Sequence, residues 1–206
     1  MAAAKKAAKK GKAEAIEIPQ PKFGMLKVVV VGDSPLVCHR WSEKQKKVLA
    51  DKQQKKATGP RQAKDPEAEY KDSLYTLPGK KGYYFPTVAF KKAMVDACSF
   101  VSDLTKVAAR GAFHVVGEYV QLEGKPVMRE DIVVVANGNP DLRYRGEFKQ
   151  WSAELCIRFF ESFISAEQIL NLLNTAGFAI GVGESRPQKN GSWGMFHVAD
   201  RKESGR

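Results

Sequence analysis

The chain has 206 residues, enough for one domain with a substantial core, and 43% of them are hydrophobic, which excludes a wholly disordered protein. The longest apolar runs, such as 28–31 and 132–136, are strand-sized, so we expect neither a membrane span nor a membrane partner. The N-terminal Ala/Lys-rich segment has no apolar stretch behind it, which argues against a secretory signal.

The net charge of +11 is unevenly distributed. Residues 1–12 carry five lysines and no acidic residue, and residues 42–64 carry eight lysines or arginines against Glu43 and Asp51. These two segments account for the whole net charge, so the rest of the chain is close to neutral. A polyanionic partner would explain the pattern, because each lysine placed at a phosphate releases a counterion. A solubility tail and a solvated helix face are the alternative.

The predicted elements follow from apolar periodicity and turn residues. We expect residues 1–22 to form a flexible basic tail and residues 201–206 a polar tail, with a single domain over 23–200. In chain order, the expected elements are strand 25–31, helix 88–101, strands 112–122 and 127–136, a hairpin of 142–148 and 151–160, helix 166–176, and strand 194–199.

A lysine-rich arm at about 42–82 interrupts this pattern. Lys, Gln, Glu and Ala favour helix, but Val48 and Leu49 are the only large apolar residues in its first half, so it cannot be a core helix. Helix ends are also predicted: Thr87 as an N-cap, Ser165 with Gln168 as a capping box, and Gly177 as the residue after a C-terminus.

Without the arm and the 142–160 hairpin, the order is βαββαβ. This order predicts an α+β fold of the ferredoxin-like (RRM-like) type, an antiparallel sheet with both helices on one face. The extra hairpin and the inserted basic helical arm would be additions to it. The open face of such a sheet is a common platform for single-stranded nucleic acid.

Residues 177–194 contain five glycines. Glycine lets a backbone approach a partner closely and point N–H groups into a concavity, while Arg186 and Lys189 add charge and Trp193 a stacking surface. This combination suits a phosphate–sugar backbone. The alternative is a structural turn that docks the last strand. A dinucleotide fingerprint is excluded, because this segment follows a helix and precedes a strand.

Other basic residues are candidates for nucleic-acid contacts. Arg143 and Arg145 share one face of a strand, where they would clamp phosphates or else pair with Asp141 and Glu147. The remaining candidates lie in the tail, the arm and the connection after the first core helix: Lys5, Lys6, Lys9, Lys10, Lys46, Lys47, Lys55, Lys56, Lys106 and Arg110.

Cysteines and histidines give no sign of a metal or cofactor site. Three cysteines are widely spaced, and His39, His114 and His197 have no ligand spacing. We therefore expect no metal site, no cofactor and no disulfide framework.

The loop from Gly181 to Phe196 has the form GxGxxRPxxxGxxGxF and lies between a helix and a final strand. It resembles the signature of the RAMP superfamily, the ferredoxin-like proteins of CRISPR effector complexes. The first strand, which runs into Gly32–His39, also resembles the first strand of their backbone-forming subunits. The resemblance implies RNA or single-stranded DNA binding, with side-by-side assembly along the strand. The matching loop positions are Gly181, Gly183, Arg186, Gly191 and Gly194.

The stretch 26–198 further resembles a family of uncharacterised proteins of tailed phages and prophages. The shared segments are Phe-Pro-x-x-Ala-Phe-Lys-Lys at 85–92, Arg-Gly-Ala-Phe at 110–113 and Leu-Arg-Tyr-Arg-Gly-Glu-Phe at 142–148. A single ferredoxin-like unit with a lysine-rich arm departs from the RAMP pattern. A phage role in replication, recombination or counter-defence is therefore as open as a CRISPR-like role. We expect a cytoplasmic protein, in the host cytoplasm if it is phage-encoded.

These observations predict a non-enzymatic protein that binds single-stranded RNA or DNA and assembles as a homo-oligomer or filament. Two alternatives stay open. One is a metal-independent endoribonuclease using His39, since some RAMP proteins use a histidine near their start. Nothing in the sequence supplies a second catalytic group. The other is a phage protein–protein interaction or counter-defence module.

Overall fold

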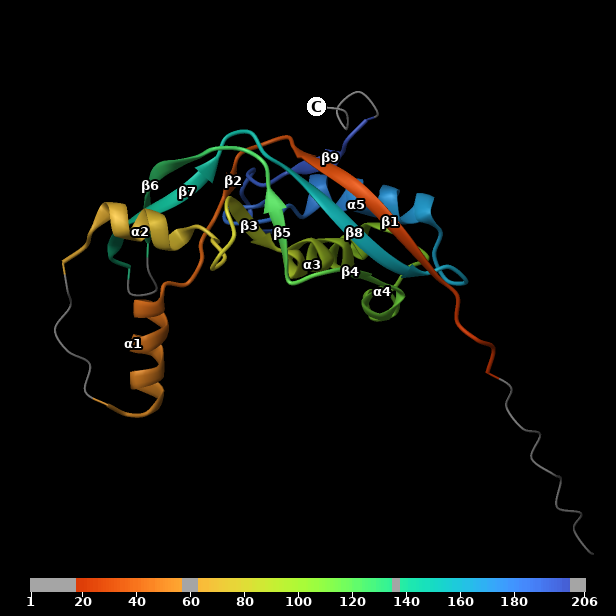
Figure 1. Ribbon diagram of the computed structural model, residues 1–206, viewed down its shortest axis with the longest axis horizontal. Coiled ribbons are helices and arrows are strands. Elements are labelled where there is room, and N and C mark those ends of the chain that lie inside the picture. Colours follow the sequence, from red (N-terminus) through yellow and green to blue (C-terminus); the bar gives the residue numbers. More distant parts are fainter. Residues whose placement is uncertain (1–17, 57–62, 135–137, 201–206) are drawn as a thin grey trace, which may run out of the picture.

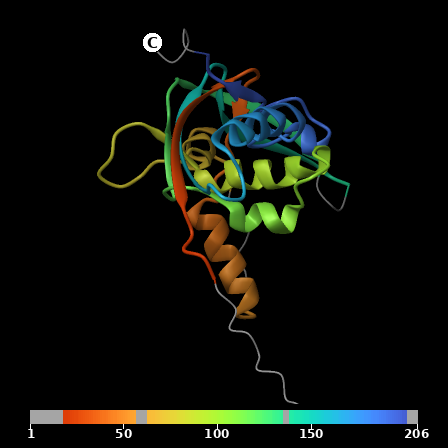
Figure 2. The same cartoon turned by 90° about the vertical axis from the view of Figure 1, so that its right-hand side faces the viewer.

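The computed structural model describes residues 18–56, 63–134 and 138–200. Its core is a four-stranded antiparallel sheet in the order β4-β8-β1-β9. The core elements in chain order are β1 (Phe23–Gly32), α3 (Thr87–Ala97), β4 (Phe113–Val115), β8 (Ser152–Phe160), α5 (Ala166–Ala179) and β9 (Phe196–Val198). Both helices lie on one side of the sheet (Figure 1, Figure 2). The predicted α+β, ferredoxin-like βαββαβ fold is confirmed.

Alternating burial explains the central strands. On β8, Ala153, Leu155, Ile157 and Phe159 are buried, and the residues between them are partly or fully exposed. This period-2 pattern places one face of the strand against the helices. The predicted capping box opens α5, because the Ser165 hydroxyl accepts from the Gln168 N–H and the Gln168 side chain accepts from the Ser165 N–H.

Aromatic side chains fill the core where the helices meet the end of the sheet. The ring of Phe90 on α3 lies 5.6 Å from that of Phe196 on β9 and 6.5 Å from that of Trp151. Trp151 is buried, yet its indole N–H donates to the Ser34 carbonyl at 2.9 Å. Each such aromatic contributes roughly 1.5–3 kcal/mol by burial.

Two smaller sheets and several short helices complete the fold. One sheet has the order β2-β7-β6, and the other pairs β3 with β5. Their bounds are β2 (Leu36–Val37), β7 (Pro140–Phe148), β6 (Pro126–Val134), β3 (Tyr83–Pro86) and β5 (Tyr119–Leu122). The helices are α1 (Glu43–Gln53), α2 (Pro66–Ser73), η1 (Cys98–Phe100), α4 (Lys106–Ala112) and η2 (Pro187–Lys189).

The predicted basic arm contains α1 and α2. Every residue of α1 is at least partly exposed, in agreement with the prediction that it cannot be a core helix. This helix projects away from the body (Figure 1, Figure 2). Of the predicted tails 1–22 and 201–206, residues 1–17 and 201–206 lie outside the described residues.

The prediction of which strands form the additional hairpin was wrong. We expected 127–136 to belong to the core sheet and 142–160 to form the additional hairpin, but β8 is the core strand and pairs with β1 from Phe23↔Phe160 to Val31↔Ser152. The additional hairpin is β6–β7. Every residue of β6 is at least partly exposed, so its β-branched run does not enter the core.

The expected strand 112–122 is also wrong. It is split into β4 and β5, because Gly117 takes φ +88° between them and turns the chain. The predicted helix 88–101 ends at Ala97, followed by the short η1. Pro86, not Thr87, is the N-cap, and the Thr87 hydroxyl instead donates to the Glu118 carbonyl at 3.1 Å.

Gly177 does not end α5, as the sequence had suggested. The helix continues to Ala179, and Gly181 takes the left-handed conformation after it, with φ +69°. Gly177 is required for packing instead, since a Cβ there would overlap the carbonyl oxygen of Phe196. The final strand is shorter than the predicted 194–199.

Candidate functional site

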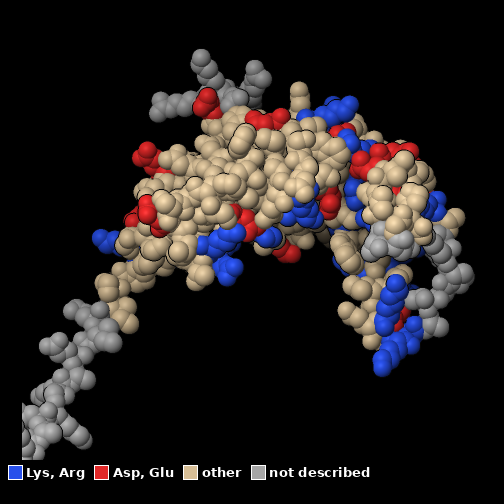
Figure 3. Space-filling view, turned by 180° about the vertical axis from the view of Figure 1, so that it is seen from behind, with Lys and Arg blue, Asp and Glu red and all other residues tan. Residues whose placement is uncertain are grey.

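A cleft of about 930 Å³ lies between α1, α2 and β7; we call it the arm cleft. From behind, the arm stands off from the body with a hollow beneath, and Lys and Arg side chains lie along it (Figure 3). Basic residues outnumber acidic ones in the lining. The lining includes Arg40, Lys44, Lys47, Lys52, Lys64, Arg143 and Arg145, with Asp51, Asp65, Glu69, Asp72 and Asp141.

Local capping and packing position the two arm helices. Ser42 opens α1 with a capping box to Gln45, and the Asp65 side chain caps α2. The C-terminal end of α2 is anchored on β7, because the Ser73 hydroxyl accepts from the Gly146 N–H at 2.8 Å. Leu74 packs so closely on Gly146 that a Cβ would overlap its side chain.

His39 joins the arm cleft to the glycine-rich loop. Its Nδ1 lies 3.3 Å from the Oε1 of Glu184. The pKa of Glu184 is lowered to about 2, chiefly by this hydrogen bond, against opposing burial, with the charges of His39, Arg145 and Lys189 adding to the effect. Glu184 was missed by sequence reasoning, since no local pattern links it to His39.

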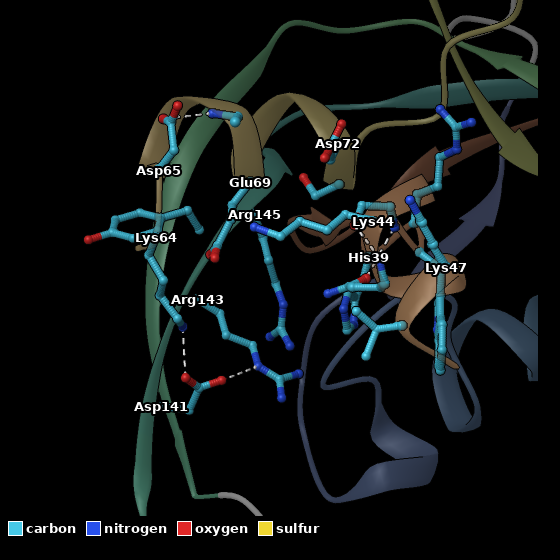
Figure 4. Close-up of a pocket in the computed structure, with 18 of the residues that line it drawn as sticks. His39, Lys44, Lys47, Lys64, Asp65, Glu69, Asp72, Asp141, Arg143 and Arg145 are labelled. Atoms are coloured by element: carbon cyan, nitrogen blue, oxygen red, sulfur yellow. Dashed lines mark hydrogen bonds and ion pairs between the residues drawn. The ribbon is translucent and has the colours of Figure 1, made fainter. Parts of the chain in front are cut away.

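Arg143 shares a carboxylate with the arm. Arg143 Nε donates to Asp141 Oδ2 at 3.2 Å, and Lys64 Nζ lies 2.7 Å from Asp141 Oδ1. Figure 4 shows both cations converging on Asp141. These contacts hold the pKa of Asp141 below its usual range, with the hydrogen bond from Lys64 as the largest cause. Arg143 therefore makes the predicted pairing with Asp141 and also lines the arm cleft.

Arg145 is buried, with 5% of its surface exposed. Its Nη1 lies 3.6 Å from Asp131 Oδ2, and its Nε has no hydrogen-bond partner among the described residues. Glu147 pairs with Arg129 across the hairpin, at 2.8 Å, rather than with Arg143 or Arg145 as one alternative had suggested. Arg129 also donates to Asp131 Oδ1 at 2.8 Å. The predicted arginine pair thus consists of the partly buried Arg143 and the buried Arg145.

The glycine-rich loop packs on β2 and on itself. The N–H groups of Val182, Glu184 and Gly194 donate to the backbone carbonyls of Gly194, Val37 and Pro35. A Cβ at Gly183, Gly191 or Gly194 would collide with neighbouring backbone. The N–H groups of Val182, Glu184 and Gly194 are therefore not available to a ligand. Contacts with a partner would come from the loop's side chains. The predicted roles of Gly181, Gly183, Gly191 and Gly194 stay predictions.

Arg186 and Lys106 meet in a different network. Arg186 donates from Nε and Nη2 to the Gln188 side chain, which donates to Asp96 at 2.7 Å. Lys106 lies 3.8 Å from the same carboxylate. Asp96 is partly buried, which opposes ionisation, but hydrogen bonds from Lys92 and Gln188 lower its pKa. The structure thus links Arg186 to Lys106 through Gln188 and Asp96, and Arg186 does not line the arm cleft.

The other predicted residues are scattered. Of the arm lysines, Lys47 lines the arm cleft, while Lys46 pairs with Glu43 on the exposed surface of α1. Lys55 and Lys56 follow α1, Arg110 lies on α4, and Lys189 is exposed in η2. Lys5, Lys6, Lys9 and Lys10 lie outside the described residues. Lys44, Lys52 and Lys64, missed as individual residues, belong to the basic segment 42–64 that the charge count had singled out.

Within 18–56, 63–134 and 138–200, three or more His, Cys, Asp or Glu side chains do not gather in a way that could hold a metal ion. The helices of those ranges are also too short or too polar to cross a membrane.

Comparison with known proteins gives a likeness of fold. No protein-family model and no curated protein matches the sequence. A chain from a cryo-EM structure of the type III-B Cmr-beta bound to cognate target RNA matches with a TM-score of 0.56 and 10% identity; the match covers 87% of this chain and 60% of that one. Crystalline Cmr6 from Pyrococcus furiosus matches with a TM-score of 0.45 and 10% identity, over 87% of this chain and all of that one. The first match shows a RAMP-like fold, as the loop signature predicted. This chain spans 60% of the length of that first match.

Proposed function

We propose that this protein is a non-enzymatic nucleic-acid-binding protein whose arm cleft holds the phosphate–sugar backbone of a single strand of RNA or DNA. One observation carries the proposal: cationic side chains from α1, the start of α2 and β7 converge on one cleft (Figure 4). The fold it shares with a structure bound to target RNA supports the same class of ligand.

The charges of the arm cleft suit phosphates. Asp141 is shared by Lys64 and Arg143, so this cluster carries an excess positive charge. Lys44 and Lys47 add cations from α1. Phosphate oxygens would accept hydrogen bonds from these groups, and every cation placed at a phosphate releases a counterion, which makes such binding salt-dependent.

A titration with fluorescently labelled oligonucleotides tests the proposal. Anisotropy is measured with single-stranded RNA, single-stranded DNA and duplex DNA of one length at low salt. We expect saturable binding of at least one single strand, tighter than binding of the duplex. The absence of binding to every strand at low salt would contradict the proposal.

We also propose that copies assemble side by side along the strand, as the RAMP resemblance implies. Native mass spectrometry with oligonucleotides of increasing length would show more copies bound to longer strands. One copy on every length would exclude this arrangement. A phage origin, with a role in replication, recombination or counter-defence, remains part of the proposal, and a pull-down after nuclease treatment that recovers host proteins would favour the counter-defence role.

One observation favours a second candidate, a metal-independent endoribonuclease. His39 lines the arm cleft, and Glu184 contacts its Nδ1 at 3.3 Å, a contact that would orient a histidine acting as an acid or base. RNA cleavage in EDTA that is lost in His39→Ala would support this activity. Intact RNA after incubation with a range of structured and unstructured substrates would exclude it.

A further inference from the structure

The sheet face opposite α3 and α5 carries a second set of aromatic and basic side chains. In β1 and β8, cross-strand neighbours Phe23↔Phe160, Met25↔Arg158 and Lys27↔Cys156 stand on one face. We call these six residues the Phe23 platform. The intervening residues Leu26 and Ile157 point to the other face, and Ile157 is fully buried there. In Figure 2 both helices lie on that other side of β1.

Contacts between these side chains hold the platform in place. The rings of Phe23 and Phe160 are 5.7 Å apart, and the Arg158 guanidinium lies 4.4 Å from the Phe23 ring centroid. Met25 Sδ is 3.3 Å from Cys156 Sγ. Even so, Phe23 is 53% exposed and Met25 60% exposed. The result is an ordered apolar surface that the described chain leaves open to solvent.

We propose that unpaired bases of a single strand stack on the Phe23 platform, with Lys27 and Arg158 at the neighbouring phosphates. Aromatic rings beside basic side chains match the alternation of base and phosphate in a single strand. This inference rests on the proposed function, because it says which part of the bound single strand contacts the platform, namely its unpaired bases.

Charge argues against a second copy of the chain as the occupant. Two copies meeting face to face through this surface would bring Lys27 and Arg158 of one near the same residues of the other, and like charges repel. A duplex is also a poor occupant, since its bases are already stacked. The platform lies toward the opposite end of the body from α1 and α2 (Figure 1), so it is a separate contact from the arm cleft.

The test compares oligonucleotides that differ in their bases. The probes are a labelled single strand, made of whichever of RNA and DNA the wild type binds more tightly, and an abasic strand of the same kind and length, which keeps the phosphates but has no bases. We expect Phe23→Ala to weaken binding of the base-containing strand about 5- to 150-fold, the range for loss of one stacked base, and to leave binding of the abasic strand unchanged. Phe23→Trp should restore affinity for the base-containing strand.

Phe178→Ala is the matched control, because Phe178 is an aromatic on α5 that is 74% exposed on the helical side. It should leave both affinities unchanged, and urea unfolding should show that each variant is folded. Equal losses for both strands, or no loss in Phe23→Ala while the wild type binds, would overturn the platform and leave the proposed function standing. No binding by the wild type would remove both. A dimer of the wild type that Phe23→Ala dissociates in sedimentation would assign the platform to a second copy and overturn the proposal.

Discussion

The guanidinium of Arg129 lies 3.8 Å from the ring centroid of Trp193, and this contact joins the β6–β7 hairpin to the glycine-rich loop. One face of the Trp193 ring is therefore covered by a cation within the protein. A base would have to stack on its other face or displace Arg129. Arg129 also donates hydrogen bonds to Asp131 and Glu147, so one side chain links both strands of the hairpin to the loop.

Removing Arg129 should destabilise the fold. In Arg129→Met, the partly buried carboxylates of Asp131 and Glu147 lose their hydrogen-bonded cation, and we expect the free energy of unfolding to fall by about 2–4 kcal/mol. Urea denaturation followed by tryptophan fluorescence measures it. The control is Lys71→Met, whose pair with Glu67 is exposed and should contribute less than about 0.5 kcal/mol. Equal effects of the two substitutions would contradict this account of the network.

The choice of hairpin shows what sequence periodicity leaves undecided. The alternation of buried and exposed residues on β8 correctly predicted a strand with one buried face. It did not show which other strand β8 pairs with, or to which sheet it belongs. The pairing of β8 with β1 decides it, and such long-range pairing has no local signature. The exposed run of β6, with Ile132 and Val134 each 75% exposed, resembles a core strand by composition alone.

The candidate site was predicted in part. Charge concentration pointed to the arm, and strand geometry placed Arg143 and Arg145 on one face. The arm cleft could not be predicted, because its walls come from α1, α2 and β7, which only the tertiary structure brings together. Glu184 was missed for the same reason, since its partner His39 is distant in the chain.

The glycines of the loop should be intolerant of substitution for a structural reason. Gly194 has φ +65°, and a Cβ there would overlap the Val182 carbonyl, so Gly194→Ala should cost at least about 2 kcal/mol. Gly111→Ala is the control, because that site in α4 has open space around it and should gain about 0.5–1 kcal/mol from helix propensity. Thermal unfolding compares them. A Gly194→Ala variant as stable as the wild type would refute the packing described for this loop.

Glu184 should make stability depend on pH at the acid end. Its pKa in the folded protein is about 2, below the ordinary value of about 4.3 in an unfolded chain. A depressed pKa stabilises the fold above the ordinary value, and the stabilisation is lost as the pH falls toward 2. Wild type should exceed Glu184→Gln by about 1–3 kcal/mol at pH 6, with the difference shrinking by pH 2.5. A difference that stays constant over this range would show that folding does not lower the pKa of Glu184.

The lysine-rich N-terminal segment should contribute to the salt dependence of binding. Deletion of residues 1–12 removes five lysines. If all five reach phosphates, the slope of log affinity against log salt should flatten by up to roughly 3.5 on a single strand. The full chain and the truncated chain are titrated at several salt concentrations. Identical slopes would mean that this segment neutralises no phosphates.

The central claim is that the arm cleft binds the strand's phosphates. Lys47, Lys64 and Arg143 represent its three walls, and a variant with all three changed to glutamine removes three cations without large changes in side-chain length. The measurement is the salt slope of single-strand binding, obtained by anisotropy at several salt concentrations, for this cleft variant and the wild type.

The matched control changes Lys80, Lys125 and Lys149 to glutamine, since these lysines are exposed and do not line the arm cleft. We predict that the cleft variant binds more weakly, with a slope flatter than that of the wild type by up to about 2, and that the control keeps the wild-type slope. Equal slopes for the cleft variant and the wild type would contradict the assignment of the arm cleft as the nucleic-acid site.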